Sequence, residues 1–296
     1  MAGSRRRHGS YWTAWLYLAP VLLLFAVFWF YPMFMLVHDS FFEWDAISQR
    51  VYLGLQNYRD LLSDTAFWNA VGNTFIFILG SVPVGMAIGL GLALMLYKDI
   101  PGRGAFRTTF FSPVATSRVA AGLIWVWLLN FDYGILNILL MKMGVGKVPW
   151  LISDNYAMFS VIAMTVWKDA GYNMVLFLGG LYAIDRTYYE AAGIDGAGRW
   201  QKFRDVTWPL LLPTTMFILV TRVIFTFRAF EQVYAMTRGG PAGATTVFVY
   251  YIYEKAFQDF QLGYASAASV IMLITVLACT FLLMKLVRTG KWRETA

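Results

Sequence analysis

Six ionisable residues lie inside long apolar stretches of the sequence: Arg118, Lys168, Asp169, Arg222, Arg228 and Glu231. Inside a membrane such a group costs about 2.5–3.5 kcal/mol at mid-helix, so it is kept where it is paired or where it lines a polar pathway. Arg228 and Glu231 are three residues apart, and this spacing predicts a pair on one helix face. The alternative to a polar pathway is a purely structural role, in which all six residues are neutralised at helix interfaces or reach the lipid headgroups.

Two of these residues, Lys168 and Asp169, are adjacent in the chain. They point to different faces of a helix, so each needs a partner of its own. Tyr172 and Asn173, one turn further on, are the candidate partners. A substrate path through the membrane is predicted to involve Lys168, Asp169, Tyr172, Asn173, Arg222 and Glu231.

A charged segment, residues 185–208, separates two apolar runs. Thr187 and Glu190 have the spacing of a capping box, which predicts a helix that begins at Thr187. Three glycines are expected to interrupt this helix: Gly193, Gly196 and Gly198. A second, basic and aromatic helical turn is expected over 199–207, and Pro209 then opens the next apolar run as a first-turn residue. A folded helix–glycine–helix loop at a membrane face is a docking element.

The composition places these residues in a membrane protein. The chain of 296 residues is 59% hydrophobic and 18% aromatic, with only 14% charged residues. A membrane span needs about 20 mostly apolar residues. Six spans are predicted, near residues 12–37, 70–97, 108–129, 156–184, 209–236 and 264–286. The expected fold is therefore an all-α polytopic membrane protein with six transmembrane helices, the first of which is too long for a cleaved secretory signal.

The remaining segments fit this organisation. Residues 1–11 form a basic tail, 12–286 the six-span domain and 287–296 a C-terminal tail. A small-residue face for close helix contact is expected on the second span at Gly85, Gly89 and Gly91. Three connections are long enough for short helices and are candidates to contact an extracytoplasmic partner: 38–69, 130–155 and 237–263.

The distribution of Lys and Arg predicts the orientation, because cationic loops resist export. On the side of both termini we find Arg5, Arg6, Arg7, Lys98, Arg103, Arg107, Arg186, Arg199, Lys202, Arg204, Lys285, Arg288, Lys291 and Arg293. The opposite loops contain Arg50, Arg59, Lys142, Lys147, Arg238 and Lys255. Both termini and the 185–208 segment should therefore face the cytoplasm, and the net charge of +7 reflects topology and contact with anionic lipid, with no need for nucleic acid.

The sequence lacks the residues that histidine-based catalysis, a histidine-rich metal site and ATP hydrolysis by a phosphate-binding loop require. Only His8 and His38 are present, so a histidine-based catalyst or metal site is hard to build, and an enzyme is disfavoured. The segment 144–148 lacks the first glycine and the hydroxyl residue of a phosphate-binding loop, so this chain is not expected to hydrolyse ATP by that route. The single cysteine, Cys279, cannot form a disulfide within the chain.

One motif in the charged segment resembles a known family. Glu190-Ala191-Ala192, three residues, Gly196, nine residues and then Val206-Thr207-Trp208-Pro209 resemble the EAA loop of binding-protein-dependent ABC importer permeases. In the family this motif ends with Ile-x-Leu-Pro. In this chain Val206 stands at the Ile position and Trp208 at the Leu position.

Two further stretches are similar to the carbohydrate-uptake branch of the same family. Residues 237–246, with the aromatic and small residues that follow as far as 267, form one of them. Gly54-Leu55-Gln56-Asn57-Tyr58, in the first external loop, is the other. The similarity runs from about Trp15 to the last span, and the subfamily resembles the maltose-type first permease, including members that import multiple sugars or glycerol 3-phosphate.

The resemblance implies a type I ABC importer permease fold with cytoplasmic coupling helices, in a bacterial cytoplasmic (inner) membrane. It implies four kinds of partner: a second homologous permease, two cytoplasmic ABC ATPase subunits that bind ATP and Mg, an extracytoplasmic solute-binding protein, and membrane lipid. This chain itself would bind no cofactor and no metal. The residues expected to couple it to the ATPases are Glu190, Ala191, Ala192, Gly193, Asp195, Gly196, Arg199, Phe203 and Pro209.

Two other classes of function compete with this one. A proton-coupled secondary transporter would use the membrane carboxylates Asp169 and Glu231. A membrane enzyme for lipid-linked sugars would need paired carboxylates at one face, and the nearest cluster is Asp39, Glu43 and Asp45, which is better explained as a solvated loop. For an importer, a neutral sugar or oligosaccharide is the first expectation. Glycerol 3-phosphate or its diesters are the second, since four basic and two acidic groups within the spans also tolerate a phosphate.

Overall fold

The computed structural model describes residues 11–289, with side chains from 15 to 285. The predicted tails lie almost wholly outside this range. The described chain is helical apart from loops and one two-stranded sheet. It forms two compact units, of which one contains 11–63 and 252–272 and the other contains 64–251 and 273–289.

The first unit begins with one continuous helical run. It consists of α1 (Tyr11–Phe25), the π-helical turn η1 (Ala26–Phe30) and α2 (Tyr31–Asp39). The other elements are β1 (Phe42–Glu43), the antiparallel β2 (Val51–Tyr52), α3 (Gln56–Ser63), η3 (Glu254–Gln258) and the start of α14 (Leu262–Thr289). No part of the apolar window in the first run is buried within the chain.

The family-like motif of the first external loop holds this unit together. The amide of Asn57 is buried and donates to the carbonyl oxygens of Ser40 and Phe42 at 2.9 and 3.0 Å. The Tyr58 hydroxyl lies 2.7 Å from the hydroxyl of Ser40. The motif is therefore a clamp on the end of α2 and on β1, since buried amides rarely remain without partners.

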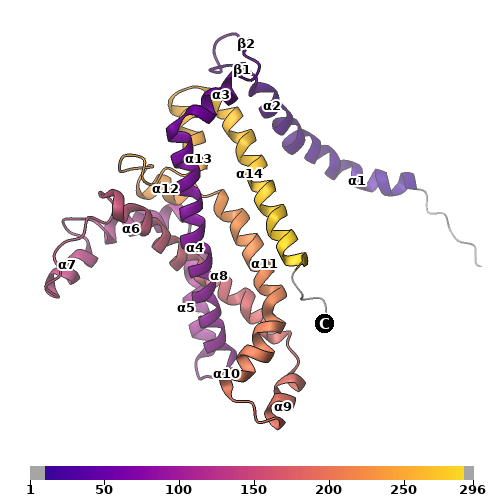
Figure 1. The fold of residues 1–296 in the computed structure, drawn as a ribbon, viewed down its shortest axis with the longest axis vertical. Helices are drawn as coiled ribbons and strands as arrows, with labels where there is room; N and C mark the ends of the chain where they lie inside the picture. The colour runs from indigo at the N-terminus through magenta and orange to yellow at the C-terminus, as the bar shows by residue number, and fades with distance from the viewer. Residues whose placement is uncertain (1–10, 290–296) are drawn as a thin grey trace, which may run out of the picture. The chain divides into compact units, whose positions relative to one another are not determined.

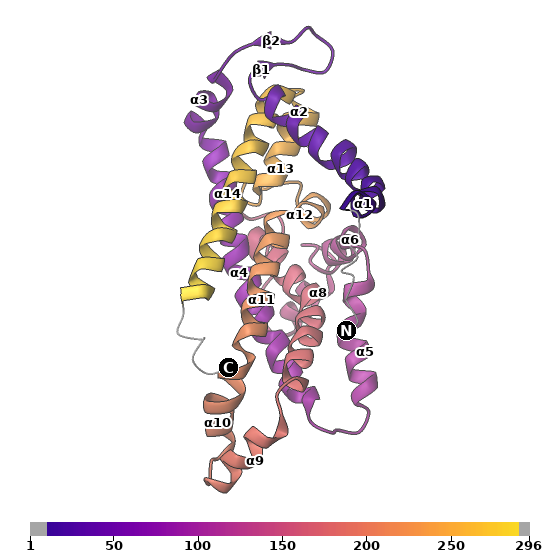
Figure 2. The same ribbon diagram turned by 90° about the vertical axis from the view of Figure 1, so that its right-hand side faces the viewer.

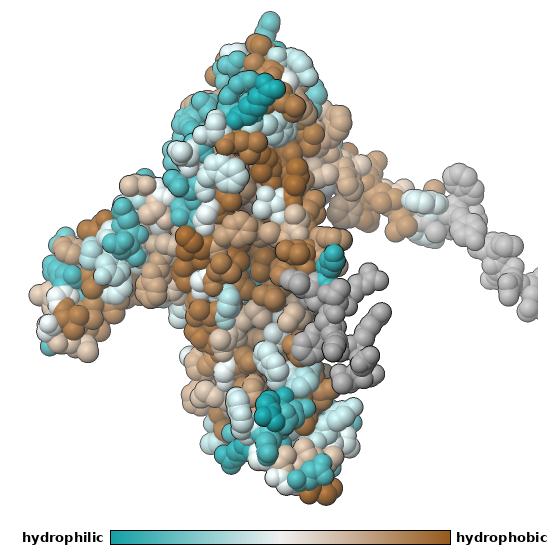
Figure 3. Space-filling model, viewed as in Figure 1, coloured by the Kyte–Doolittle hydropathy of each residue, from teal (hydrophilic) through white to brown (hydrophobic). Residues whose placement is uncertain are grey.

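The second unit is a bundle of long and short helices. Its elements are α4 (Thr65–Tyr97), α5 (Arg103–Ala115), α6 (Arg118–Leu128), α7 (Ile135–Lys142), α8 (Asp154–Tyr182), α9 (Arg186–Ile194), α10 (Arg199–Lys202), the π-helical η2 (Phe203–Thr207), α11 (Trp208–Phe227), α12 (Glu231–Met236) and α13 (Phe248–Tyr253). Its apolar core is formed mainly by α4, α8 and α11, which lie side by side with α9 and α10 beyond their ends (Figures 1 and 2). Hydrophobic side chains cover these long helices, and hydrophilic ones gather at the end formed by α9 and α10 (Figure 3).

The predicted spans correspond to these helices with two corrections. The third, 108–129, is not one helix, because α5 and α6 meet at a 98° bend. The fifth, 209–236, is also wrong: the helical run extends from Arg199 to Phe227, and α12 is a separate short helix. Thr116 and Ser117 at the bend both adopt extended backbone, which ends α5 shortly after its proline.

Four described helices are long and apolar enough to cross a membrane, and the bent pair makes a fifth. Helix α8 has 29 residues, a length of about 43 Å at 1.5 Å per residue, but its polar residues keep it outside that apolar group. The described chain is thus predominantly helical, with helices of the length and composition that cross a membrane. The number of six spans stays a prediction.

The small-residue face of α4 is present at two of its three predicted positions. A Cβ on Gly89 would lie 2.5 Å from the Cβ of Asn173 and 3.0 Å from the Met174 nitrogen, and one on Gly85 would lie 3.4 Å from the Asn173 amide nitrogen. Gly91 faces open space, so the prediction is wrong there. Helices α4 and α8 therefore approach closely only where a glycine permits it.

This contact gives a matched pair of substitutions. We expect Gly89→Ala to destabilise the protein by about 1–3 kcal/mol, because the methyl group must displace the backbone of α8. Gly91→Ala should leave stability unchanged or slightly higher, since alanine favours a helix more than glycine does. Thermal unfolding of the detergent-solubilised protein measures both, and equal melting temperatures for the two variants would contradict the assigned contact.

Candidate functional site

The charged segment forms a hairpin of two helices at one end of the second unit (Figure 1). Asp185 caps α9, and its carboxylate accepts hydrogen bonds from the backbone N–H and the hydroxyl of Thr187, both at 2.9 Å. The predicted capping box is therefore wrong, because Asp185 occupies the cap position and Thr187 lies inside the helix. Glu190 is exposed and forms no hydrogen bond or ion pair within the described chain.

The cap gives the hairpin a pH dependence with a defined sign. The backbone and side-chain hydrogen bonds from Thr187 hold the pKa of the exposed Asp185 carboxyl below its usual 3.8. A lowered pKa in the folded state means that the stabilisation is present above the unfolded pKa and is lost as the pH falls through the folded pKa. We expect hydrogen-exchange protection of residues 187–190 to fall in that acidic range. In Asp185→Asn, which keeps the acceptor but does not titrate, protection should not change there; the same acid-induced loss in both proteins would contradict this assignment.

Gly196 ends α9 in a left-handed conformation, with φ of +76°. Its N–H donates to the Gly193 carbonyl at 3.1 Å, and the N–H of Ala197 donates to the Ala192 carbonyl at 2.9 Å. These bonds satisfy the last carbonyl groups of the helix in the manner of a glycine C-cap. The predicted interruption is thus confirmed at Gly196, whereas Gly193 lies within α9 and interrupts nothing.

The second arm of the hairpin is continuous with α11. Gly198 precedes α10, and its N–H donates to the Gln201 side-chain oxygen at 2.7 Å. The helical run then passes through the π-helical turn η2 into α11. Pro209 lies in the first turn of α11, as predicted, but the chain is already helical before it. Proline has no N–H, and a local π-helical turn is a common way for a helix to accommodate the missing bond.

The two arms of the hairpin are tied together and carry exposed apolar side chains. The hydroxyl groups of Tyr189 and Thr207 lie 3.0 Å apart. Ile194 and Trp200 are 88% and 69% exposed, and Trp200 stacks on Phe203 with 5.6 Å between ring centroids. A rigid polar loop with exposed apolar side chains has the properties of an interaction surface.

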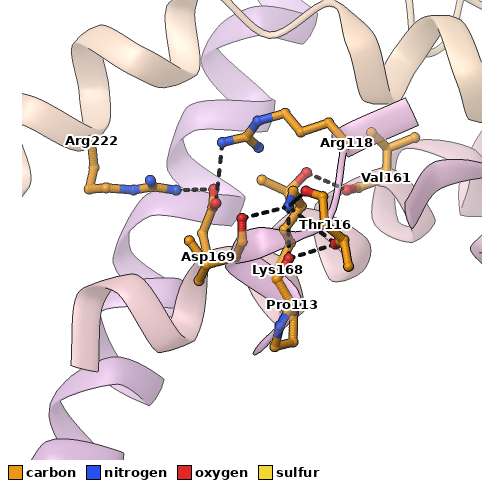
Figure 4. Close-up of polar contacts among 9 residues, drawn as sticks. Pro113, Thr116, Arg118, Val161, Lys168, Asp169 and Arg222 are labelled. Carbon is orange, nitrogen blue, oxygen red and sulfur yellow. Dashed lines mark hydrogen bonds and ion pairs between the residues drawn. The ribbon is translucent and has the colours of Figure 1, made fainter. Parts of the chain in front are cut away.

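A buried carboxylate links three helices of the bundle (Figure 4). Asp169 of α8 accepts from Arg118, the first residue of α6, at 3.2 Å, and through its other oxygen from Arg222 of α11. Arg222 is almost fully buried, while the side chain of Arg118 is 32% exposed. The two charge-assisted hydrogen bonds offset the free-energy cost of placing the Asp169 carboxylate in the membrane.

The adjacent Lys168 stabilises the break between α5 and α6. Its ammonium group donates to the carbonyl oxygens of Pro113 at 2.8 Å and Thr116 at 2.6 Å, with a longer contact of 3.4 Å to Val114 (Figure 4). These carbonyls lose their helical partners where α5 ends, so the lysine replaces the missing donors. Lys168 thus acts as a structural cap for the end of α5.

The other pairings predicted from spacing differ from the structure. Tyr172 and Asn173 are not the partners of Lys168 and Asp169: Tyr172 instead lies under the Arg222 guanidinium, with 5.9 Å to the ring centroid. Asn173 is buried against α4 and its carbonyl oxygen has no hydrogen bond within the described residues. Arg228 and Glu231 form no ion pair within the side chains described, because α11 ends at Phe227 and the two residues do not share a helix face.

A polar cavity of about 200 Å³ adjoins this network. Its lining includes Arg118, Asp169, Arg222, Arg228, Glu231 and Gln232. Three arginines and two carboxylates leave one positive charge in surplus. Among the predicted path residues, the structure thus places Asp169, Arg222 and Glu231 on this cavity; Lys168, Tyr172 and Asn173 are not on its wall.

Arg118, Arg228 and Gln232 line the cavity but were not among the predicted path residues. Arg118 was recognisable as a charge in an apolar run, but nothing in the sequence near it indicates a partner 51 residues away. Gln232 carries no charge, and its position is set only by the break between α11 and α12. The family-like loop 237–246 lies close by in sequence and is closed on itself, with the Thr237 and Thr245 hydroxyls 2.7 Å apart.

Comparison with known proteins identifies the class. A model of the family "binding-protein-dependent transport system inner membrane component" matches residues 21–292, and the chain belongs to this family. It is therefore a permease, a transport subunit and not an enzyme. The membership decides against both the proton-coupled transporter and the membrane enzyme.

Several relatives are similar over most of the chain. A sulfoquinovosyl glycerol transport system permease of Agrobacterium fabrum is 33% identical over 290 residues, 94% of each chain. An sn-glycerol-3-phosphate transport system permease of the same organism is 35% identical and covers 90% of this chain and 91% of its own. A trehalose/maltose transport system permease of Thermococcus litoralis is 35% identical, with 84% and 83% covered.

A solved structure supports the same fold. The crystal structure of a bacterial alginate ABC transporter, in complex with an alginate pentasaccharide-bound periplasmic protein, contains a chain with a TM-score of 0.81 to this one. The two are 27% identical, and the match covers 92% of each chain. The fold is that of a type I ABC importer permease.

Proposed function

We propose that this chain is one of two permeases of an ATP-driven importer for a carbohydrate or a substituted polyol. The substrates named for the relatives, sulfoquinovosyl glycerol, sn-glycerol 3-phosphate, trehalose or maltose, and alginate, support this substrate class. The alginate transporter binds a periplasmic protein, which supports a solute-binding protein as the donor of substrate.

One observation carries the proposal: a single helix connects the hairpin to the polar cavity. The helical run Arg199–Phe227 begins in the hairpin and contains Arg222, which lies about 35 Å further along at 1.5 Å per residue. A helix of this length transmits a displacement of its end to the Asp169 network. An ATPase pair that closes on ATP would thereby change the access of substrate to the cavity.

The hairpin residues have distinct roles in this proposal. Ile194 and Trp200 insert into the ATPase surface, and the exposed Glu190 pairs with a cation on that surface. The small side chains of Ala191 and Ala192 allow the ATPase to approach the helix backbone closely. ATP and Mg are bound by the ATPase subunits, and no cofactor is bound by this chain.

The second permease and the lipid cover the apolar surface of the first helical run. The apolar window between Trp15 and Asp39 has no buried residue within the chain, so its apolar surface requires another covering. The excess of Lys and Arg on the side of the termini supports a cytoplasmic location for both termini and for the hairpin, in a bacterial cytoplasmic membrane.

Reconstituted transport tests the proposal. Proteoliposomes containing both permeases and the ATPase subunits should take up substrate only when ATP is inside the vesicle and the binding protein is outside. Addition of an uncoupler should leave this uptake intact. Uptake that continues without ATP and collapses with the uncoupler would overturn the proposal.

A further inference from the structure

The cavity next to Asp169 contains polar groups that have no partner in the chain. Arg228 is exposed to it and forms no hydrogen bond or ion pair with any described residue. Gln232 is only 3% exposed, lines the cavity and likewise forms no side-chain hydrogen bond within the described range. Polar groups that are open to a cavity and have no partner in the chain mark a place where a ligand or water completes the bonding.

Some charged side chains of the cavity are already paired within the chain, whereas others are free to bind a ligand. Asp169 is held by Arg118 and Arg222, which leaves this triad with one positive charge. Arg228 adds a second cation with no carboxylate bonded to it, and Glu231 is the only free carboxylate on the described wall. The ammonium group of Lys168 is occupied by carbonyl oxygens and does not change this balance.

We propose that this cavity binds the acidic substituent of a carbohydrate or polyol, such as a phosphate, sulfonate or carboxylate, through Arg228 and Arg118. The inference rests on the proposed import function and names the substrate class. Arginine binds the oxygens of such groups in a planar, two-pronged contact. Glu231 and Gln232 then bond hydroxyl groups of the same molecule, since a carboxylate accepts from a hydroxyl and an amide both donates and accepts.

The size of the cavity fits one end of such a molecule. A volume of about 200 Å³ is below the usual range for a whole drug-sized ligand. An acidic group with part of a sugar or polyol therefore fills it. An acidic carbohydrate or polyol is thereby placed before a neutral one, the opposite of the order expected from the sequence, because Arg228 lines the cavity without a carboxylate bonded to it among the described residues.

The test compares charged and neutral probes on the assembled transporter. In nanodiscs without binding protein, tryptophan fluorescence titrations would use sn-glycerol 3-phosphate, glucuronate and the neutral methyl α-glucoside. We expect at least one acidic probe to bind about tenfold more tightly than the neutral one, the size of effect expected for charged hydrogen bonds. Arg228→Gln should remove this preference, and Glu231→Gln should increase the affinity for acidic probes, since it removes a like charge.

Two controls keep the outcomes separate. Lys142→Gln removes an exposed cation on α7, outside the cavity and without an ion pair among the described side chains, and should not alter the preference. ATP hydrolysis of the same preparations reports on the proposed function. If hydrolysis is normal but acidic and neutral probes bind equally, or no acidic probe binds, this inference fails and the importer stands. If no ATPase subunits assemble with the chain, the proposed function fails whatever the probes show.

Discussion

Replacement of Gly196 by proline is expected to abolish ATP-driven uptake while the protein still inserts into the membrane. Gly196 has a φ of +76°, and its N–H bonds to Gly193 at the end of α9. Proline fixes φ near about −65° and has no N–H, so the turn between α9 and α10 cannot form. A distortion of about 3 kcal/mol in the docking element corresponds to roughly a hundredfold loss of coupled uptake.

The geometry of this glycine provides graded controls. A Cβ built at Gly196 meets no atom within 4 Å, so the effect comes from the backbone and not from crowding. Gly196→Asn should retain most uptake, because asparagine tolerates the left-handed conformation, and Gly196→Ala should be intermediate. Uptake in proteoliposomes and the amount of folded protein measure the series. Wild-type uptake by the proline variant would refute the role given to this turn.

Removal of the Asp169 carboxylate should have the largest effect on stability. In Asp169→Ala, Arg222 remains as a buried cation without its partner, and breaking a buried ion pair from one side costs about 3–5 kcal/mol. We expect a large fall in the thermal midpoint of the solubilised protein and poor assembly with the other subunits. Glu231→Gln, which alters a carboxylate on the same cavity without an ion pair among the described residues, should hardly change the midpoint.

A double substitution distinguishes a structural pair from an essential contact with substrate. Asp169→Leu with Arg222→Met replaces both charges by apolar groups and should restore most of the stability. The exposed part of Arg118 can then reach solvent. If the double variant is as unstable as Asp169→Ala, the cost does not come from the unpaired arginine, and the assigned pairing is wrong.

The sequence predicted the features that depend on composition and short spacing. Apolar runs of sufficient length indicated the membrane helices, and the motif at 190–209 indicated the hairpin and its turn at Gly196. The capping residue was assigned incorrectly because two positions only two residues apart, Asp185 and Thr187, both have suitable side chains. Local propensity does not decide between them, whereas the backbone geometry does.

Residue spacing in the sequence could not predict the contacts between distant parts of the chain. Asp169 pairs with residues 51 and 53 positions away, across three helices, and no local pattern connects them. The bend between α5 and α6 depends on Lys168, whose role as a cap becomes visible only when α8 lies beside the broken helix. The continuous helix through Pro209 was missed because proline usually marks a start, and here a π-helical turn accommodates it.

The central claim is that the 185–208 hairpin is the surface gripped by the ATPase subunits. Cysteines at Ala192 and Gly198, in a Cys279→Ser background, should crosslink to the ATPases in the functional assembled complex, with yields that change on addition of ATP. A cysteine at Met143, 75% exposed in a predicted external connection, should not. Capture of the ATPases at Met143, or at none of the three positions, would contradict the account.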